Sequence, residues 1–461
     1  MPDRLLAQLL IRAKYEICRL SGPGGFAKNV SILAGGTTAS QALAVCLTPL
    51  LTRLYPVEDF GYFQLYLSFM AFATLTATLR YEQAILLPEE EHTALNLVVV
   101  TFCAVVLSSA LFGLLAWRLH QSTWLPRSAA PLGPFWWVVV LGVFGAGVYQ
   151  TLNFWALRQT AYKRVAGTKF TQVFLQLTTQ MGLGLSHVGP FGLLFGDAVG
   201  RMGGSLSLAQ LLWSRSRESL RAISWKTLRN AAARYWRFPL ISCGSALINT
   251  AGYALPAVLI AQFYGAKTLG WFALGDRVLG APVMLVGQAV SQVYAVEAAN
   301  FSNANPTKLQ ALFLGSIKRL ALLGLAPLFL FLFLSPLLFG FVFGHGWREA
   351  GVYASLLSFS YYFAFIVWPL MPTLNLLEEQ FWQLSWDIGR LVLTLGSLLV
   401  AYRLGWSARA AVGLFSAAMI VGYLVHLFLS RQAIQRRIQR FSAVGETAIT
   451  ASQTVANLGE L

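Results

Sequence analysis

Apolar residues along this chain are grouped into twelve stretches of about 20 residues each, separated by short polar segments. An α-helix of that length spans the hydrocarbon core of a bilayer and satisfies its own backbone hydrogen bonds. The pattern therefore predicts an all-α integral membrane protein with about twelve transmembrane helices. The predicted spans are 29–51, 60–79, 94–117, 135–157, 170–188, 191–213, 238–263, 269–296, 320–343, 350–377, 381–402 and 410–429.

A short pattern occurs twice, as LTRLYPVEDFGYF at 51–63 and as IAQFYGAKTLGWF at 260–272. We expect each copy to end one span, to turn tightly and to open the next. An internal repeat at half the chain length predicts two six-helix lobes, and an even number of spans per lobe makes the repeats parallel. The identical pairs are Tyr55 with Tyr264, Gly61 with Gly270, and Phe63 with Phe272.

The same pattern gives the expected organisation of the chain. An N-terminal segment with leucines on one helical face and arginines on the other precedes the first lobe, and a basic linker rich in Arg, Trp and Leu joins the lobes. Both segments are predicted to lie on the membrane surface, and the small, polar tail is expected to be loose. The predicted parts are 1–28 (N-terminal segment), 29–213 (N-lobe), 214–237 (linker), 238–430 (C-lobe) and 431–461 (tail).

Composition and charge agree with a membrane location. Of the 461 residues, 56% are hydrophobic and 11% are charged, with a mean hydropathy of +0.61, whereas soluble proteins carry roughly 25% charged residues. The net charge of +16 does not indicate a nucleic-acid partner, because the basic residues lie between apolar segments. With the N-terminus inside, 24 of the 34 Lys and Arg residues fall in inside segments and 7 in outside loops. Both termini are therefore predicted to be cytoplasmic, with anionic lipids as partners at that face.

Polar residues inside spans point to a binding site, because a charged side chain at mid-helix costs roughly 2.5–3.5 kcal/mol to insert. The eighth span places Gln288 and Gln292 on the same face as Arg277, and the fifth carries a similar stripe of Gln and Thr. Such stripes indicate a hydrophilic cleft or, alternatively, hydrogen bonds between helices. We expect the cleft for Arg277 and the glutamines, and the packing alternative for Ser and Thr alone. The candidate substrate-binding residues are Arg277, Arg80, Gln41, Gln172, Gln176, Asn249, Gln288 and Gln292.

Other intramembrane residues have structural interpretations. The Asp197–Arg201 and Asp387–Arg390 pairs are spaced to close ion pairs along their own helices. Arg80 ends the second span, so its charge can also reach the membrane surface by snorkelling. Glycines recur every four residues from 192 to 204, which predicts a ridge for close helix packing. The four cysteines are scattered without metal-binding spacing, and no metal or cofactor is expected.

Three motifs carry a family resemblance: PLLTRLYPVEDFGYF (49–63), RYEQAILLP (80–88) and ALGDRVLGAPVMLVGQAV (273–290). On these, the chain resembles the polysaccharide-transporter branch of the multidrug/oligosaccharidyl-lipid/polysaccharide (MOP) flippase superfamily. The resemblance implies two six-helix lobes around a central cavity in a bacterial inner membrane. It also implies a polyprenyl-pyrophosphate-linked oligosaccharide as substrate, of the undecaprenyl type, and a place beside other polysaccharide assembly proteins. The saccharide would be an O-antigen, capsule or exopolysaccharide repeat unit.

Two other functions compete with lipid-linked oligosaccharide flipping. A multidrug/cation antiporter of the same superfamily would need acidic residues free to bind cations, but each acid in a span core has an Arg within four residues. A membrane-embedded glycosyltransferase or polymerase would need a catalytic carboxylate on the outer side, where Glu58 and Asp59 lie. Their repeat counterparts are Lys267 and Thr268, and Asp59 and Thr268 are both good helix N-caps, so the position does not require an acid. We therefore expect a transporter and not an enzyme.

Overall fold

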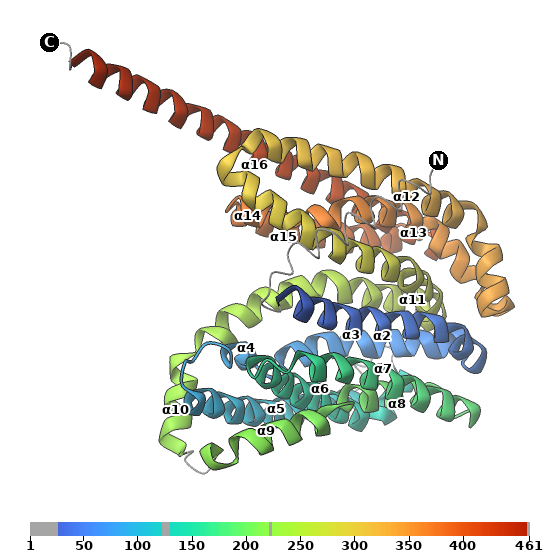
Figure 1. Cartoon of the computed structure of the whole chain (residues 1–461). Helices are drawn as coiled ribbons and strands as arrows, with labels where there is room; N and C mark the ends of the chain where they lie inside the picture. The colour runs from blue at the N-terminus through green and yellow to red at the C-terminus, as the bar shows by residue number, and fades with distance from the viewer. Residues whose placement is uncertain (1–25, 122–129, 221–223, 459–461) are drawn as a thin grey trace. The chain divides into compact units, whose positions relative to one another are not determined.

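The computed structural model describes residues 26–121, 130–220 and 224–458, so the predicted N-terminal surface helix lies almost entirely outside the described residues. The described chain is built of helices and short helical turns (Figure 1). The helices are α2 (Phe26–Leu54), α3 (Val57–Ala77), α4 (Tyr81–Ala84), α5 (Glu91–Gln121), α6 (Trp136–Arg158), α7 (Tyr162–Leu185), α8 (Phe191–Met202), α9 (Ser205–Leu220), α10 (Trp225–Arg234), α11 (Cys243–Ala304), α12 (Pro306–Phe343), α13 (Arg348–Val367), α14 (Pro372–Leu376), α15 (Gln380–Arg403) and α16 (Ala408–Leu458). The helical turns are η1 (Ala130–Phe135), η2 (Phe238–Ser242), η3 (His345–Trp347) and η4 (Trp368–Leu370).

These helices follow the order of the twelve predicted spans. Seven helical segments in the described part are long and apolar enough to cross a membrane. One of them, Ala246–Ser302, is interrupted at Gly265, whose φ of 86° is non-helical. It covers most of the span predicted at 238–263 and all of the span predicted at 269–296. The more polar spans correspond to α2, α3, α7 and the pair α8–α9, which is broken at Gly203 and Gly204. Fold class and helix order are as the sequence predicts.

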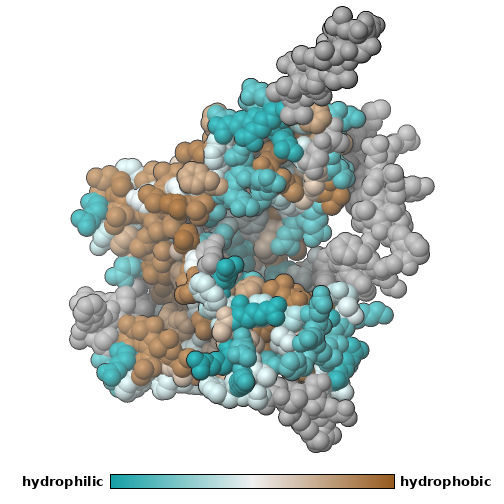
Figure 2. Space-filling view, turned by 90° about the vertical axis from the view of Figure 1, so that its left-hand side faces the viewer, coloured by the Kyte–Doolittle hydropathy of each residue, from teal (hydrophilic) through white to brown (hydrophobic). Residues whose placement is uncertain are grey.

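Lipid-compatible surface covers much of the protein. On α12, Leu322, Phe333, Leu337 and Phe341 are each about 70% exposed or more. Figure 2 shows such apolar residues as broad brown areas that are interrupted by hydrophilic ones. A soluble protein rarely exposes so much contiguous apolar surface, so these faces fit contact with lipid.

The chain forms two compact units. The first contains residues up to 55 and from 69 to 247, and the second contains 56–68 and 248–461. In the first unit α7 packs on α2 and α8, and α5 packs on α6. In the second, α13 packs on α12 and α16, and α15 packs on α16. Residues 56–68, the first part of α3, are the exception to chain order, because they pack with the second unit.

The repeat explains this exception. A Cβ atom at Gly61 would collide with the backbone oxygen of Ala266, and one at Gly270 would collide with the backbone oxygen of Val57. Val57 and Ala266 are themselves equivalent positions of the repeat, so the two copies pack on each other symmetrically. Because glycine has no side chain, it lets the two backbones come this close. The tight turn predicted for each copy lies at residues 55–56 and at Gly265, whereas Gly61 and Gly270 serve helix contact.

The linker and the tail both contain helix. Helix α10 is capped by Ser224 and packs on α5, where the Thr227 hydroxyl donates to Asn96 Oδ1 at 3.0 Å. Helix α10 of the linker is therefore bound to α5 in the first unit, while Trp225, the first residue of α10, stays 80% exposed. In the tail, α16 continues as one helix to Leu458 (Figure 1).

Candidate functional site

The second half of α11 has a polar face and an apolar face, both exposed. Arg277, Gln288 and Gln292 are exposed, and at about 100° per residue they lie within about 60° of one another around the helix. Val286 and Val293, which are 42% and 59% exposed, lie about 160–180° from Arg277. This helix therefore exposes Gln and Arg on one side and Val on the opposite side. Such a pattern is typical of a helix that faces water on one side and lipid on the other.

Arg277 lies where α11 meets α3. It lines a small pocket together with Phe60, Phe63 and Gln64 of α3. Its neighbour Asp276 points elsewhere, since the Tyr361 hydroxyl of α13 donates a hydrogen bond to Asp276 Oδ1 at 2.5 Å. The acid next to Arg277 is thus hydrogen-bonded to a tyrosine on another helix. Gln64 was not among the predicted residues.

The predicted ion pairs both form along their own helices. Arg201 Nε contacts Asp197 Oδ2 at 2.5 Å, and Arg390 Nη2 lies 3.9 Å from Asp387 Oδ1. Arg390 is 5% exposed, and its guanidinium lies over the rings of Tyr253 and Trp386. These contacts hold the two arginines in structural roles.

The glutamines of α7 meet the glycine ridge of α8. A Cβ at Gly200 would lie 2.6 Å from the Gln176 Cβ, and Gln172 Nε2 donates to the Arg201 carbonyl oxygen at 3.3 Å. Gln180 on the same helix is 1% exposed and donates to the Leu193 carbonyl oxygen. The predicted packing ridge is therefore present. This packing favours hydrogen bonding between helices as the role of the polar stripe on α7. Substrate binding by Gln172 and Gln176 stays a prediction.

Two further candidates lie on other helices. Gln41 is partly exposed on α2, and Asn249 is exposed on the first half of α11. Each lies where a polar ligand could reach it. Their role in binding stays a prediction.

Arg80 lies at a backbone turn that the sequence did not predict. Leu79 and Arg80 both have positive φ, 51° and 63°, and the chain then enters the short helix α4. Glu82 on α4 is fully buried, and Gln150 Nε2 of α6 donates to its Oε1 at 3.1 Å. Burial raises the pKa of Glu82 above its usual range, which favours the protonated carboxyl. The RYEQAILLP motif thus places an acid inside the protein next to the partly exposed Arg80.

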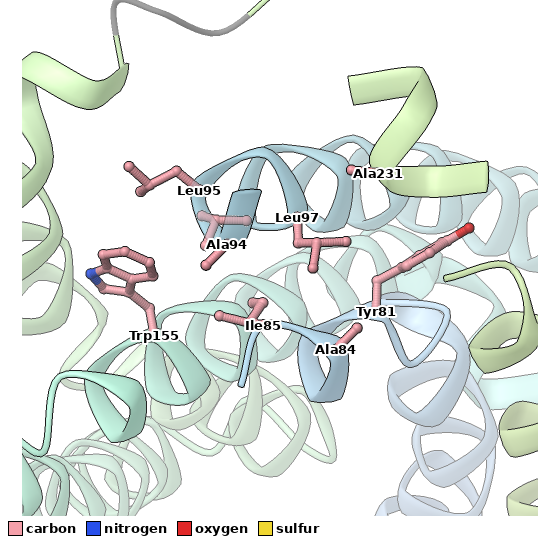
Figure 3. Packing of buried hydrophobic residues seen from close by; sticks show 9 residues of the cluster. Tyr81, Ala84, Ile85, Ala94, Leu95, Leu97, Trp155 and Ala231 are labelled. Carbon is pink, nitrogen blue, oxygen red and sulfur yellow. The ribbon is translucent and has the colours of Figure 1, made fainter. Parts of the chain in front are cut away.

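Apolar packing fixes this turn. Tyr81, Ala84 and Ile85 pack against Leu97 of α5 and Trp155 of α6 (Figure 3). The same cluster includes Ala231 of α10, and the Tyr81 hydroxyl donates to the Ala232 carbonyl oxygen at 3.2 Å. The linker helix and the RYEQAILLP motif are therefore held together in the first unit. Two charged residues, Arg80 and Glu82, directly after a predicted span are the sequence signal that could have marked this turn.

Comparison with known proteins identifies the family. The model of a family described as polysaccharide biosynthesis protein matches residues 50–352. The chain belongs to this family. The matched region contains the repeat contact, the Glu82 turn and the polar face of α11. No curated protein sequence matches the chain.

Solved structures show the fold of this family member. An inward-facing multidrug resistance MATE family transporter of the MOP superfamily matches with a TM-score of 0.59 at 15% identity, covering 91% of this chain and 98% of that one. The lipid II flippase MurJ in its inward closed conformation matches with a TM-score of 0.60 at 12% identity, covering 87% and 89%. A MOP superfamily transporter from Pyrococcus furiosus, described as having a binding pocket of reverse polarity, matches with 0.53 at 16%, covering 89% and 96%. The chain shares the fold of these membrane proteins.

Proposed function

We propose that this protein is a flippase that carries a polyprenyl-pyrophosphate-linked oligosaccharide from the inner to the outer leaflet of a bacterial inner membrane. The observation that carries the proposal is the exposed Arg277–Gln288–Gln292 face of α11. The family, whose description concerns polysaccharide biosynthesis, and the fold shared with a lipid II flippase support it. Both termini are proposed to be cytoplasmic, on the charge distribution of the sequence.

The physical problem that such a protein solves is the transfer of sugar hydroxyls through hydrocarbon. Each unpaired hydroxyl costs roughly 4–8 kcal/mol on the alkane scale. A saccharide with several hydroxyls therefore has a barrier of tens of kcal/mol. Amide side chains such as Gln288 and Gln292 both donate and accept hydrogen bonds, so they replace water for the hydroxyls. Arg277 supplies the charge-assisted contacts that a pyrophosphate needs, and the lipid tail stays in the bilayer.

The acids in the spans favour this proposal over a cation antiporter. Asp197 and Asp387 contact arginines on their own helices, and Asp276 accepts a hydrogen bond from Tyr361. Each of these carboxylates already has a partner. A site for cationic drugs would instead need acids that are available to the ligand.

The outer acidic pair likewise favours transport over catalysis. Asp59 is 7% exposed, within the contact between the two repeats. Glu58 Oε1 lies 4.0 Å from Lys267 Nζ, which is the equivalent position of the other repeat. A glycosyltransferase carboxylate must be able to reach its substrate, whereas Asp59 is buried in helix packing and the exposed Glu58 faces the cation Lys267.

The proposal is tested by deleting the gene and analysing the lipids. A polyprenyl-linked saccharide should accumulate on the inner leaflet, and surface polysaccharide should be lost. Complementation with Arg277→Ala should fail at normal protein level. Complementation with Arg431→Ala, which removes an exposed arginine on α16, should succeed. Unchanged lipids together with new sensitivity to cationic drugs in the deletion strain would replace the proposal with the antiporter.

A further inference from the structure

A cavity of about 430 Å³ lies in the second unit, where α11, α14 and α15 meet. Ser291 of α11, Trp368 of η4, Asn375 of α14 and Gln383 of α15 contribute to its wall, and the remaining lining residues are apolar. The predicted substrate-binding residues did not include any of these four. The cavity is large enough for a small organic group and not only for water.

Two prolines explain why the helix opens here. Pro369 and Pro372 follow α13, and neither has the N–H that would continue the helical hydrogen bonds. The chain passes through η4 into the five-residue helix α14, and the Met371 N–H donates to the Trp368 carbonyl oxygen. The break turns Trp368 and Asn375 towards the cavity that Ser291 faces from α11.

The chemistry of the wall selects the kind of ligand. None of the described residues that line the cavity carries a charge. The hydroxyl of Ser291 and the amides of Asn375 and Gln383 both donate and accept hydrogen bonds, as sugar hydroxyls do. Trp368 adds a large flat surface that can cover the C–H face of a sugar ring. A phosphate or a cationic drug would require a charged partner, so the wall fits a neutral polyhydroxylated group.

The side chain of Gln383 is fixed by one hydrogen bond, and its carbonyl oxygen can accept another. Its Nε2 donates to Asp387 Oδ2 at 3.3 Å, and Asp387 is in turn next to Arg390. Among the described residues, Oε1 of Gln383 is buried without a hydrogen-bond partner. A buried acceptor in this state is unfavourable until a donor reaches it. A hydroxyl that enters the cavity would supply that donor after a small rotation of the amide.

The cavity adjoins the polar face of α11. Ser291 lies between Gln288 and Gln292 in sequence and about 40° from Arg277 around the helix. At 1.5 Å per residue, Arg277 and Ser291 are about 21 Å apart along the axis. One ligand with a charged group and a saccharide at different places can therefore reach both positions.

We propose that the cavity lined by Ser291, Trp368, Asn375 and Gln383 is a saccharide subsite that binds a sugar residue of the lipid-linked head group. This inference rests on the proposed function and adds to it the part of the protein that recognises the sugar. Arg277 then contacts the pyrophosphate, while Gln383 and Asn375 form hydrogen bonds with the sugar hydroxyls. The specificity of transport for one repeat unit resides in this cavity.

The test compares two ligands on the purified full-length protein in detergent. One ligand is the polyprenyl-linked saccharide fraction extracted from the deletion strain, and the other is undecaprenyl pyrophosphate without sugar. The variants are Gln383→Ala and Asn375→Ala, and the matched control is Gln380→Ala, an exposed glutamine on the same helix as Gln383. Affinity is measured by thermophoresis, after each variant has been shown to elute as a single species.

The expected result is a loss of affinity of about tenfold or more for the saccharide ligand in Gln383→Ala, because one hydrogen bond to a buried group is lost. Affinity for undecaprenyl pyrophosphate should be unchanged, and Gln380→Ala should bind both ligands like the wild type. If Gln383→Ala does not fold, Asn375→Ala at its exposed position provides the same comparison.

Two other outcomes are distinguishable. Equal affinity of the wild type and the variants for the saccharide ligand, or an equal loss for both ligands, overturns the subsite while the proposed flippase stands. No binding of either ligand to the wild type, with no saccharide accumulating in the deletion strain, overturns the proposed function itself and the subsite with it.

Discussion

The contact between the two repeats predicts the effect of adding a single methyl group. In Gly61→Ala the new Cβ would overlap the backbone oxygen of Ala266, which no side-chain rotation can relieve. Helices α3 and α11 would have to separate. Overpacking of this kind costs typically about 1–3 kcal/mol. Replacing glycine by alanine inside a helix returns roughly 0.5–1 kcal/mol. The net effect is a loss of folded-state stability of up to about 2 kcal/mol.

A matched control isolates the contact. Gly396 lies inside α15 with open space where its Cβ would be. Gly396→Ala should therefore show the helix gain alone and melt at or above the temperature of the wild type. Gly61→Ala and Gly270→Ala should both melt below it, in detergent, followed by tryptophan fluorescence.

The double variant tests the symmetry of the contact. Once one alanine has separated the helices, the second meets less resistance, so the combined loss should be smaller than the sum of the two single losses. Additive losses would mean that Gly61 and Gly270 do not share one contact. A Gly61→Ala protein that melts as high as Gly396→Ala would refute the close-approach reasoning altogether.

Three further predictions concern the same purified protein. Burial, aided by the charge of Glu58, raises the pKa of Asp59 to about 6 from its usual 3.8. The stability of the folded protein should therefore fall as pH rises between about 4 and 6. Asp59→Asn should melt like the wild type near pH 4 and at a higher temperature at pH 8, and parallel curves of melting temperature against pH would contradict this. Glu82→Gln, which imitates the protonated acid beside Gln150, should retain more thermal stability than Glu82→Ala, and the reverse order would count against a buried neutral carboxyl. Gly200→Leu should strongly lower expression and melting temperature because α8 cannot approach α7, whereas Gly182→Leu, at an open position on α7, should fold; equal behaviour of the two would argue against the ridge.

Two sets of residues show how much of the candidate site could be predicted from the sequence. Arg277, Gln288 and Gln292 were recognised because a polar stripe on an apolar helix is unusual in itself, and the structure leaves all three exposed on one face. Gln172 and Gln176 formed an equally clear stripe, yet they lie against the glycines of α8. A stripe shows which side of a helix is polar but does not show whether that side meets water or another helix.

Residues that come together only through folding were missed. Trp368, Asn375 and Gln383 are spread over two helices and a break, and each has an ordinary sequence context. Glu82 was not among the predicted site residues, although the structure buries it completely. Neither composition nor periodicity reports a contact between residues that are far apart in the chain.

The sequence by itself determined the all-helical membrane fold, the order of twelve helices and the repeat. Those features follow from a constraint on each segment alone, since a span must be long, apolar and satisfied in its own hydrogen bonds. Tertiary structure alone decided that Gly61 and Gly270 are contact residues. It also decided that the α7 glutamines pack on α8, and that the break at Pro369 and Pro372 adjoins a cavity with hydroxyl and amide groups in its wall. In a membrane, a face towards lipid and a face towards another helix are both mostly apolar, so only the packed structure distinguishes them.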